Sequence, residues 1–122
     1  MNEPLRIILI ASVLVVLFDT VGSIASRQFG FAYVKLMAGS FLIYGAVGFL
    51  TAPLTTMIQG GLAAGVVGLV DATIGWVISW AIGPGRLPIG QVSFARIVNT
   101  IVIVVGLAGM LGLVGGFVSS II

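Results

Sequence analysis

The sequence predicts an all-α, polytopic membrane protein with one transmembrane domain of four helical spans across residues 1–122. Of the 122 residues, 60% are hydrophobic and only 7% are charged, and the mean hydropathy is +1.33. A soluble domain carries roughly 25% charged residues, so this composition cannot cover a globule in water. Four spans of about 20 residues each leave only short ends and connections, which excludes a separate water-soluble domain.

The four spans correspond to four long apolar runs that are separated by polar or helix-breaking residues. The first run ends at Arg27, the second begins one turn before Lys35 and ends at Pro53, and an uncharged connector occupies 53–59. The break at 83–88 contains two prolines and two glycines, which cannot continue a helix. We expect the apolar tail to extend the last helix. The predicted spans are about 5–26, 31–52, 60–82 and 95–117.

The first run also fits a second interpretation, that of a secretory signal peptide. Arg6 would stand in its positively charged region, residues 7–18 would form its apolar core, and Ser23-Ile24-Ala25 would be a small-residue cleavage site. We favour a retained membrane helix over this alternative.

Lys and Arg residues in short connections predict the orientation in the membrane. Arg27 and Lys35 flank the first connection, Arg86 and Arg96 flank the third, and Arg6 stands alone on the other side. This imbalance predicts that both termini lie outside, in a bacterial cytoplasmic membrane or an equivalent organelle membrane. The connections predicted to be cytoplasmic are 27–35 and 83–96.

Aromatic and cationic side chains near the span ends are expected to anchor the helices at the membrane interface. Trp76 and Trp80 are one turn apart near the end of the third span, and indole rings favour the headgroup level. Arg86 is either an ordinary positive-inside residue or a contact for a lipid phosphate. The predicted interface anchors are Trp76, Trp80, Arg27, Lys35, Arg86 and Arg96.

A weak internal repeat relates the two halves of the chain. The segment 19–26 (DTVGSIAS) is similar to 71–79 (DATIGWVIS), with one residue inserted between Asp and Gly, and the next spans begin with the similar segments 31–35 and 94–96. The repeat predicts two helical hairpins in parallel orientation, because an even number of helices preserves topology. In a composition so rich in small and apolar residues, chance similarity is the competing explanation.

Asp19 and Asp71 lie well inside their spans. A charged side chain near the bilayer centre costs roughly 2.5 to 3.5 kcal/mol on insertion scales. On the first helix, Ser12, Asp19 and Ser23 fall on one face at about 100° per residue, so this face is expected to point at protein or water rather than lipid. Asp71 lies at the edge of a glycine stripe on the third span.

Two interpretations of the aspartates stay open. In one, they line a path on which protons or cations bind. In the other, each aspartate is hydrogen-bonded to a neighbouring helix and only fixes packing. Tyr44 lies near the middle of the second span and needs a buried partner, for which Asp19 and Asp71 are candidates. The candidate polar residues are Asp19, Asp71, Ser12, Ser23, Tyr44 and Asn99.

Glycines spaced by three, four and seven residues on the last three spans are typical of close helix packing. Four small helices do not need so many smooth faces, so the excess predicts partners, either further copies or other membrane subunits. Membrane lipids are also expected partners. The predicted packing glycines are Gly45, Gly48, Gly61, Gly65, Gly68, Gly75, Gly109 and Gly112.

The residue inventory argues against an enzyme. The chain has no Cys and no His, which removes the commonest nucleophile–base pairs and metal ligands. The segment 68–71 (GLVD) does not match the glycine motif of the intramembrane aspartyl proteases, and the chain is much shorter than those enzymes. We expect no catalytic residue, no metal and no cofactor. The net charge of +2 gives no support to nucleic-acid binding.

In size and hydropathy the chain is similar to the small multidrug resistance transporters and the small fluoride channels, both of which work as dimers of four-helix subunits. Asp19 is the nearest analogue of the essential Glu in the first helix of the former, but no motif of either family is present. The resemblance implies that four short helices suffice for transport when duplicated. We expect a structural or accessory subunit that packs through Gly-rich faces into a homo-oligomer or larger membrane complex. The alternative is an oligomeric channel or transporter for protons, cations or small solutes that uses Asp19 and Asp71.

Overall fold

The structure, a computed structural model, describes residues 2–88, 90 and 92–122. All regular secondary structure within these residues is helical, and four helical segments are long and apolar enough to span a membrane. The predicted all-α class with four spans is therefore confirmed. The four segments are Glu3–Phe29, Tyr33–Leu54, Met57–Ile82 and Phe94–Ile121.

The first helix, α1 (Glu3–Phe29), is longer at both ends than predicted. The Asn2 side chain caps its first turn, and Gly30 ends it in the left-handed conformation with φ 77°. Arg27 lies inside the last turn rather than beyond the helix, and its guanidinium donates to the carbonyl oxygen of Ile82 at 3.0 Å. The helix continues past Arg27 because the long side chain of this residue reaches a polar partner near the helix end.

The second span starts with the short 3₁₀ helix η1 (Tyr33–Lys35), continues as α2 (Leu36–Thr51) and ends with the 3₁₀ helix η2 (Ala52–Leu54). Pro53 lies within this final turn, close to the predicted end of the span. Proline removes a backbone donor, so the α-helix stops before it and the chain tightens into a 3₁₀ turn.

The third span contains a change of helix type. It runs as α3 (Met57–Val70), widens into the π-helical turn η3 (Asp71–Gly75) and continues as α4 (Trp76–Ile82). It begins three residues before the predicted position because the Thr56 side chain caps the first turn. Gly83 ends α4 with φ 131°, a conformation that favours glycine.

The fourth span, α5 (Phe94–Ile121), is capped by Ser93 and extends almost to the last residue, as predicted for the apolar tail. The connection before it is shorter than the predicted 83–96 segment, because 94–96 already belong to α5; residues 89 and 91 of the segment lie outside the described part of the chain.

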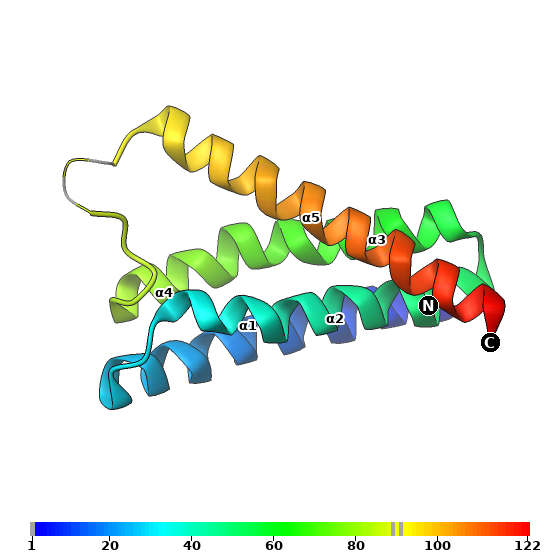
Figure 1. Cartoon of the computed structure of the whole chain (residues 1–122), viewed down its shortest axis with the longest axis horizontal. Helices are drawn as coiled ribbons and strands as arrows, with labels where there is room; N and C mark the ends of the chain where they lie inside the picture. Colours follow the sequence, from blue (N-terminus) through cyan, green and yellow to red (C-terminus); the bar gives the residue numbers. More distant parts are fainter. Residues whose placement is uncertain (1, 89, 91) are drawn as a thin grey trace.

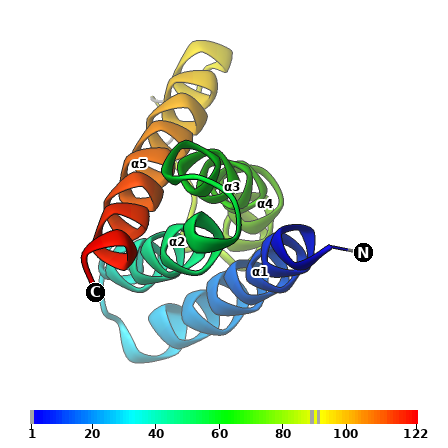
Figure 2. The same ribbon diagram turned by 90° about the vertical axis from the view of Figure 1, so that its right-hand side faces the viewer.

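Helices α2 and α3 form the centre of the bundle, and α1 and α5 flank them on different sides (Figure 2). Helices α1, α3 and α4 run in one direction, and α2 and α5 run in the other, so the N- and C-termini lie at the same end (Figure 1). The two hairpins, α1–α2 and α3–α5, therefore have the same orientation.

Helix α5 meets α2 and α3 almost backbone to backbone. A Cβ atom on Gly48 would collide with the carbonyl group of Gly112, and one on Gly115 would collide with that of Gly45. A Cβ atom on Gly61 would lie 3.2 Å from the carbonyl oxygen of Gly109. Glycine is required at these positions because only a residue without a side chain allows such a close approach.

The interior contains small side chains, and the large apolar ones point outward. Tyr44 is the largest fully buried side chain, whereas Leu42 on the same helix is 76% exposed. Similar exposed residues occur on every long helix, including Val13, Leu62 and Met110. A surface of this kind is solvated by lipid tails, which agrees with a membrane protein.

Candidate functional site

The structure brings Asp19 of α1 and Asp71 of η3 together inside the bundle. Their carboxyl groups face each other beside Gly75, where a Cβ atom would collide with Asp19 Oδ2 and would lie 3.0 Å from Asp71 Oδ1. Asp19 is only 3% exposed, and its Oδ2 atom has no hydrogen-bond donor among the described residues. The pair is therefore an acidic site inside the bundle, with Asp19 buried and Asp71 half-buried, to which two helices contribute one carboxyl each.

Both aspartates lie at a similar depth in the predicted membrane. Asp19 precedes the end of α1 at Phe29 by ten residues, and Asp71 precedes the end of α4 at Ile82 by eleven. At 1.5 Å per residue, each carboxyl lies about 15 Å along its helix from the end that carries the Gly30 and Gly83 turns. A hydrocarbon core of about 30 Å places this level near its centre.

Tyr44 of α2 holds the pair from a third helix. Its hydroxyl group donates a hydrogen bond to Asp71 Oδ2, and the tyrosine is 1% exposed. The predicted need for a buried partner is met by Asp71. Three helices thus converge on two carboxyl groups, which fixes the position of Asp71 more firmly than that of Asp19.

A second polar contact lies beside the pair. The hydroxyl groups of Ser23 on α1 and Ser79 on α4 are both fully buried and are joined by a 2.8 Å hydrogen bond. Ser23 follows Asp19 by one helical turn, so this bond fastens α1 to α4 next to the carboxyl pair. Ser26, one turn further, donates to the carbonyl oxygen of Phe31 at 2.7 Å and ties the following connection to α1.

The π turn lies at the position where the internal repeat requires an additional residue. Asp19 and Gly22 are three residues apart in regular α-helix, whereas Asp71 and Gly75 are four residues apart. The backbone N–H of Trp76 donates to Asp71 O, five residues earlier, so this turn contains one residue more than an α-helical turn. The wide turn takes up the insertion, and each half contributes an aspartate to the central contact, whereas Gly75 lies against the carboxyl groups and Gly22 lies against Leu36.

A cavity of about 160 Å³ adjoins the carboxyl pair between α2, η3 and α5. It has room for several water molecules. Its polar lining consists of Asp19, Asp71, Tyr33, Ser40, Tyr44 and Thr100. The remainder is apolar and consists of Leu36, Met37, Phe41, Ala72, Trp76, Val104 and Leu107.

None of the described basic side chains forms an ion pair with the carboxyl pair. Among the residues that the structure describes, the one ion pair joins Arg6 to Glu3 at the start of α1, at 3.0 Å. Two ionised carboxylates in contact in a medium of low dielectric repel each other, so a bound proton or cation is needed to hold them together. Within the described ranges, no group of three His, Cys, Asp or Glu side chains gathers to hold a metal ion.

Three of the six predicted polar residues do not line the cavity, and of these Ser23 lies beside the carboxyl pair in its contact with Ser79. Asn99 is on the exposed side of α5, while its neighbour Thr100 lines the cavity. Ser12 is half-buried on α1, two turns before Asp19, and is not part of the lining. The remaining candidates, Asp19, Asp71, Ser23 and Tyr44, form one cluster.

The predicted packing glycines have three different environments. Five of them lie at contacts among α2, α3 and α5, and Gly75 makes room for the two carboxyl groups. Space around the Cβ positions of Gly45 and Gly65 is open to 4 Å. The five contact glycines are Gly48, Gly61, Gly68, Gly109 and Gly112.

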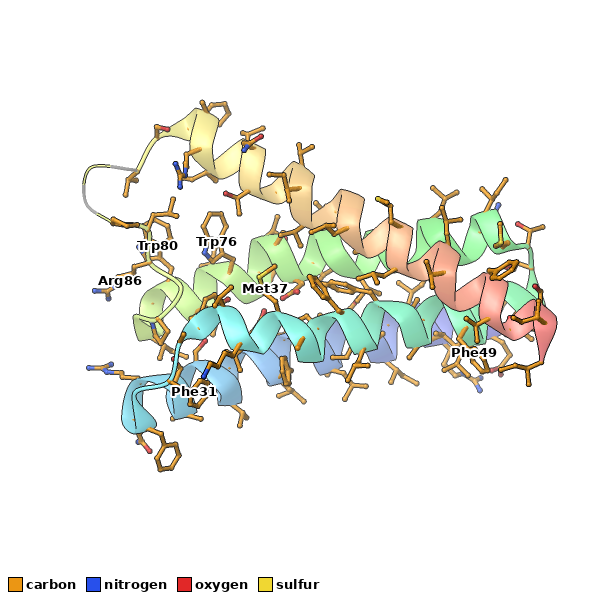
Figure 3. The ribbon with its side chains drawn as sticks, viewed as in Figure 1. Phe31, Met37, Phe49, Trp76, Trp80 and Arg86 are labelled. Atoms are coloured by element: carbon orange, nitrogen blue, oxygen red, sulfur yellow. The ribbon has the colours of Figure 1, made fainter. Side chains whose placement is uncertain are left out.

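The predicted anchors gather at the end of the bundle opposite the termini, in the helix ends and turns there. Trp76 and Trp80 project from α4 toward the start of α5 (Figure 3), and their rings are 5.7 Å apart in an edge-to-face arrangement. The Trp76 indole N–H donates to the carbonyl oxygen of Gly85 at 2.7 Å. Lys35 and Arg96 are exposed.

Tyr33, Ser40 and Thr100 line the cavity, although none of them is among the six candidate polar residues. On the second span, Tyr33, Ser40 and Tyr44 have spacings of seven and four residues. These spacings are the same as those of Ser12, Asp19 and Ser23 on the first span, so a search for polar stripes would have found them. Thr100 has no such spacing signal, and its neighbour Asn99, the more polar of the two, was the candidate on this helix.

Comparison of this chain with known protein families, curated proteins and solved structures finds no match.

Proposed function

We propose that this chain is the subunit of a membrane transporter or channel for protons or small cations, with Asp19 and Asp71 as the ion-binding site. The observation that carries the proposal is the meeting of two intramembrane carboxyl groups, from different helices, beside a cavity. Acidic residues inside a membrane protein are costly and commonly mark ion or proton pathways. Asp19 Oδ2 has no hydrogen-bond partner among the described residues, so it is available to a proton or cation.

The surroundings of the pair support reversible binding. Tyr44 satisfies one oxygen of Asp71, and the adjoining cavity, which Tyr44 also lines, provides space for water. Uptake of a proton or cation relieves the repulsion between the carboxyl groups, and its release restores that repulsion. The occupied and empty sites therefore favour different separations of α1 from η3, which couples ion binding to helix movement.

The structural or accessory role is the second candidate, and fewer glycines support it than the sequence suggested. Most packing glycines have neighbours inside the bundle, so they do not require a larger complex. Gly65 on α3 and Gly106 on α5 have no atom within 4 Å of their Cβ positions. They lie at a similar level, because α3 and α5 are antiparallel with Gly61 near Gly109. This open pair favours a homo-oligomer in which a second copy contacts α3 and α5.

We further infer that the end carrying the Gly30 and Gly83 turns faces the cytoplasm and that both termini lie outside. The support is the gathering of Arg27, Lys35 and Arg86 at that end. The assignment to a bacterial cytoplasmic membrane or an equivalent organelle membrane stays a prediction.

Ion flux into liposomes that contain the purified chain tests the proposal. We expect a proton, Na⁺ or K⁺ gradient to drive flux through the wild type, and we expect Asp19→Asn to abolish it. Asn keeps the hydrogen-bonding shape and removes the charge. Glu3→Gln is the matched control, because Glu3 is the third acidic residue and is exposed at the start of α1.

Circular dichroism and size-exclusion chromatography establish that each variant is folded. Flux that persists in Asp19→Asn, or the absence of flux of all three ions in the wild type, would overturn the proposal and favour the accessory role.

A further inference from the structure

An apolar groove opens between α4 and the start of α5. It has a volume of about 540 Å³, within the range typical of ligand sites, and Thr73 is its only lining side chain with a polar group apart from the indoles. It adjoins the carboxyl cavity, with which it shares Ala72 and Trp76. We call it the tryptophan groove. Its lining residues are Ala72, Thr73, Trp76, Val77, Trp80, Ala81, Val92, Ile97 and Ile101.

The groove exists because α5 diverges from α4 over its first turns (Figure 1). The described residues leave it open, although two large indole rings project into the space (Figure 3). An opening with an apolar lining in the membrane region is filled by apolar matter rather than water.

Arg86 is hydrogen-bonded to the last turn of α4, which carries part of the groove lining. Its Nε atom donates to the carbonyl oxygen of Trp80 at 2.8 Å, and Nη2 lies 3.4 Å from the carbonyl oxygen of Ala81. Both of these residues line the groove. Its guanidinium is thus fixed at the C-terminal end of α4, next to two residues that line the groove, and Nη1 makes no hydrogen bond to a described protein group.

Arg96 adds positive charge at the same end of the bundle. It lies in the first turn of α5, directly before Ile97, which lines the groove. None of the described acidic side chains pairs with either arginine, since Glu3 pairs with Arg6 at the opposite end. The groove therefore combines an apolar body with an uncompensated positive end.

We propose that the tryptophan groove binds one anionic phospholipid. The phosphate accepts hydrogen bonds from Arg86, and Arg96 contributes to the positive potential that attracts it. An acyl chain packs along Trp76 and Trp80, whose rings lie where indoles commonly meet lipid headgroups. The groove binds lipid whether or not the acidic pair carries ions, so this inference is independent of the proposed transport activity.

The two tryptophans make the test direct, because they are the only ones in the chain and both line the groove. Bromine atoms on an acyl chain quench indole fluorescence at contact distance. The purified chain is reconstituted in phosphatidylcholine bilayers that contain the same fraction of brominated phosphatidylglycerol or brominated phosphatidylcholine. We expect stronger quenching by the anionic lipid in the wild type.

Variants at the positive end identify the binding group. Arg86→Gln is expected to lower the relative affinity for brominated phosphatidylglycerol by about fivefold, the effect of one cation near a membrane surface. Lys35→Gln removes the same charge from the same end of the bundle, outside the groove, and should retain the preference. Circular dichroism confirms that both variants are folded.

Three results would overturn the inference. Equal quenching of the wild type by the two lipids would show that no anionic headgroup is selected. An equal loss of preference in the two variants would assign it to general surface charge. Weak quenching by both lipids, with cross-linking between tryptophan grooves, would assign the groove to a second copy of the chain.

Discussion

The two ends of the bundle are packed in opposite ways. Toward the termini, α5 contacts α2 and α3 through glycines, and backbones approach each other without intervening side chains. We refer to this part as the glycine end. Toward the other end, α5 leaves α4, and the carboxyl cavity and the tryptophan groove occupy the space. We refer to this part as the cavity end.

The composition of α5 explains the difference. All five glycines of this helix lie between 106 and 116, whereas residues 94–105 contain none and are rich in Ile and Val. Small residues allow close packing between membrane helices, and β-branched side chains hold the neighbouring backbone away. One helix can therefore close the bundle at one end and leave it open at the other. The tight end provides rigidity, and the open end provides space for binding.

The largest expected effect comes from Gly112→Ala at the glycine end. A Cβ atom there would lie 2.9 Å from the carbonyl oxygen of Gly60 and 3.1 Å from Gly61 Cα, and neither backbone atom can rotate away. We expect a loss of about 3 kcal/mol in the free energy of unfolding, the upper part of the range for overpacking. The measurement is unfolding in mixed micelles with increasing sodium dodecyl sulfate.

Gly106→Ala on the same helix is the control. Its Cβ position has no neighbour within 4 Å, and the substitution should leave the free energy of unfolding unchanged or slightly higher. Equal losses in the two variants would contradict the idea that backbone contact, rather than helix propensity, defines the glycine end.

Tyr44→Phe is expected to have the next largest effect, at the cavity end. The variant leaves Asp71 Oδ2 without its buried donor, which costs about 2 kcal/mol in the free energy of unfolding. A double-mutant cycle with Asp71→Asn should yield a coupling energy of about 0.5 to 3 kcal/mol. The same cycle with the distant Glu3→Gln should be additive, and a similar coupling there would disprove a direct contact.

The positions of the spans could be predicted because they depend on apolar length alone. Their ends differed by a few residues, because capping side chains such as Asn2 and Thr56 extend the helices into stretches that hydropathy treats as loops. Proline and glycine predicted the main breaks correctly, at Pro53 and Gly83. Local chemistry sets these features, and the sequence displays it directly.

The candidate site could be predicted only in part, because it depends on how helices are arranged around each other. The residues Asp19, Asp71, Ser23 and Tyr44 were identified from the cost of burying polar groups. Hydropathy does not encode which helices are neighbours, so the meeting of the two aspartates became visible only in the structure. The π turn was also missed, although the repeat alignment already contained its additional residue.

The smallest expected effect distinguishes two serines of one predicted stripe on α1. Ser23→Ala removes the buried hydrogen bond to Ser79, and such bonds in membrane proteins are worth about 0.6 kcal/mol on average. Ser12→Ala should cost less, because the described structure gives the Ser12 side chain no hydrogen bond. Both variants remove the same hydroxyl group from the same face of α1, so unfolding in mixed micelles isolates the contribution of the contact with α4. If Ser12→Ala destabilised the chain as much as Ser23→Ala, the stripe would be important as a whole, and the contact beside the carboxyl pair would not be the reason for it.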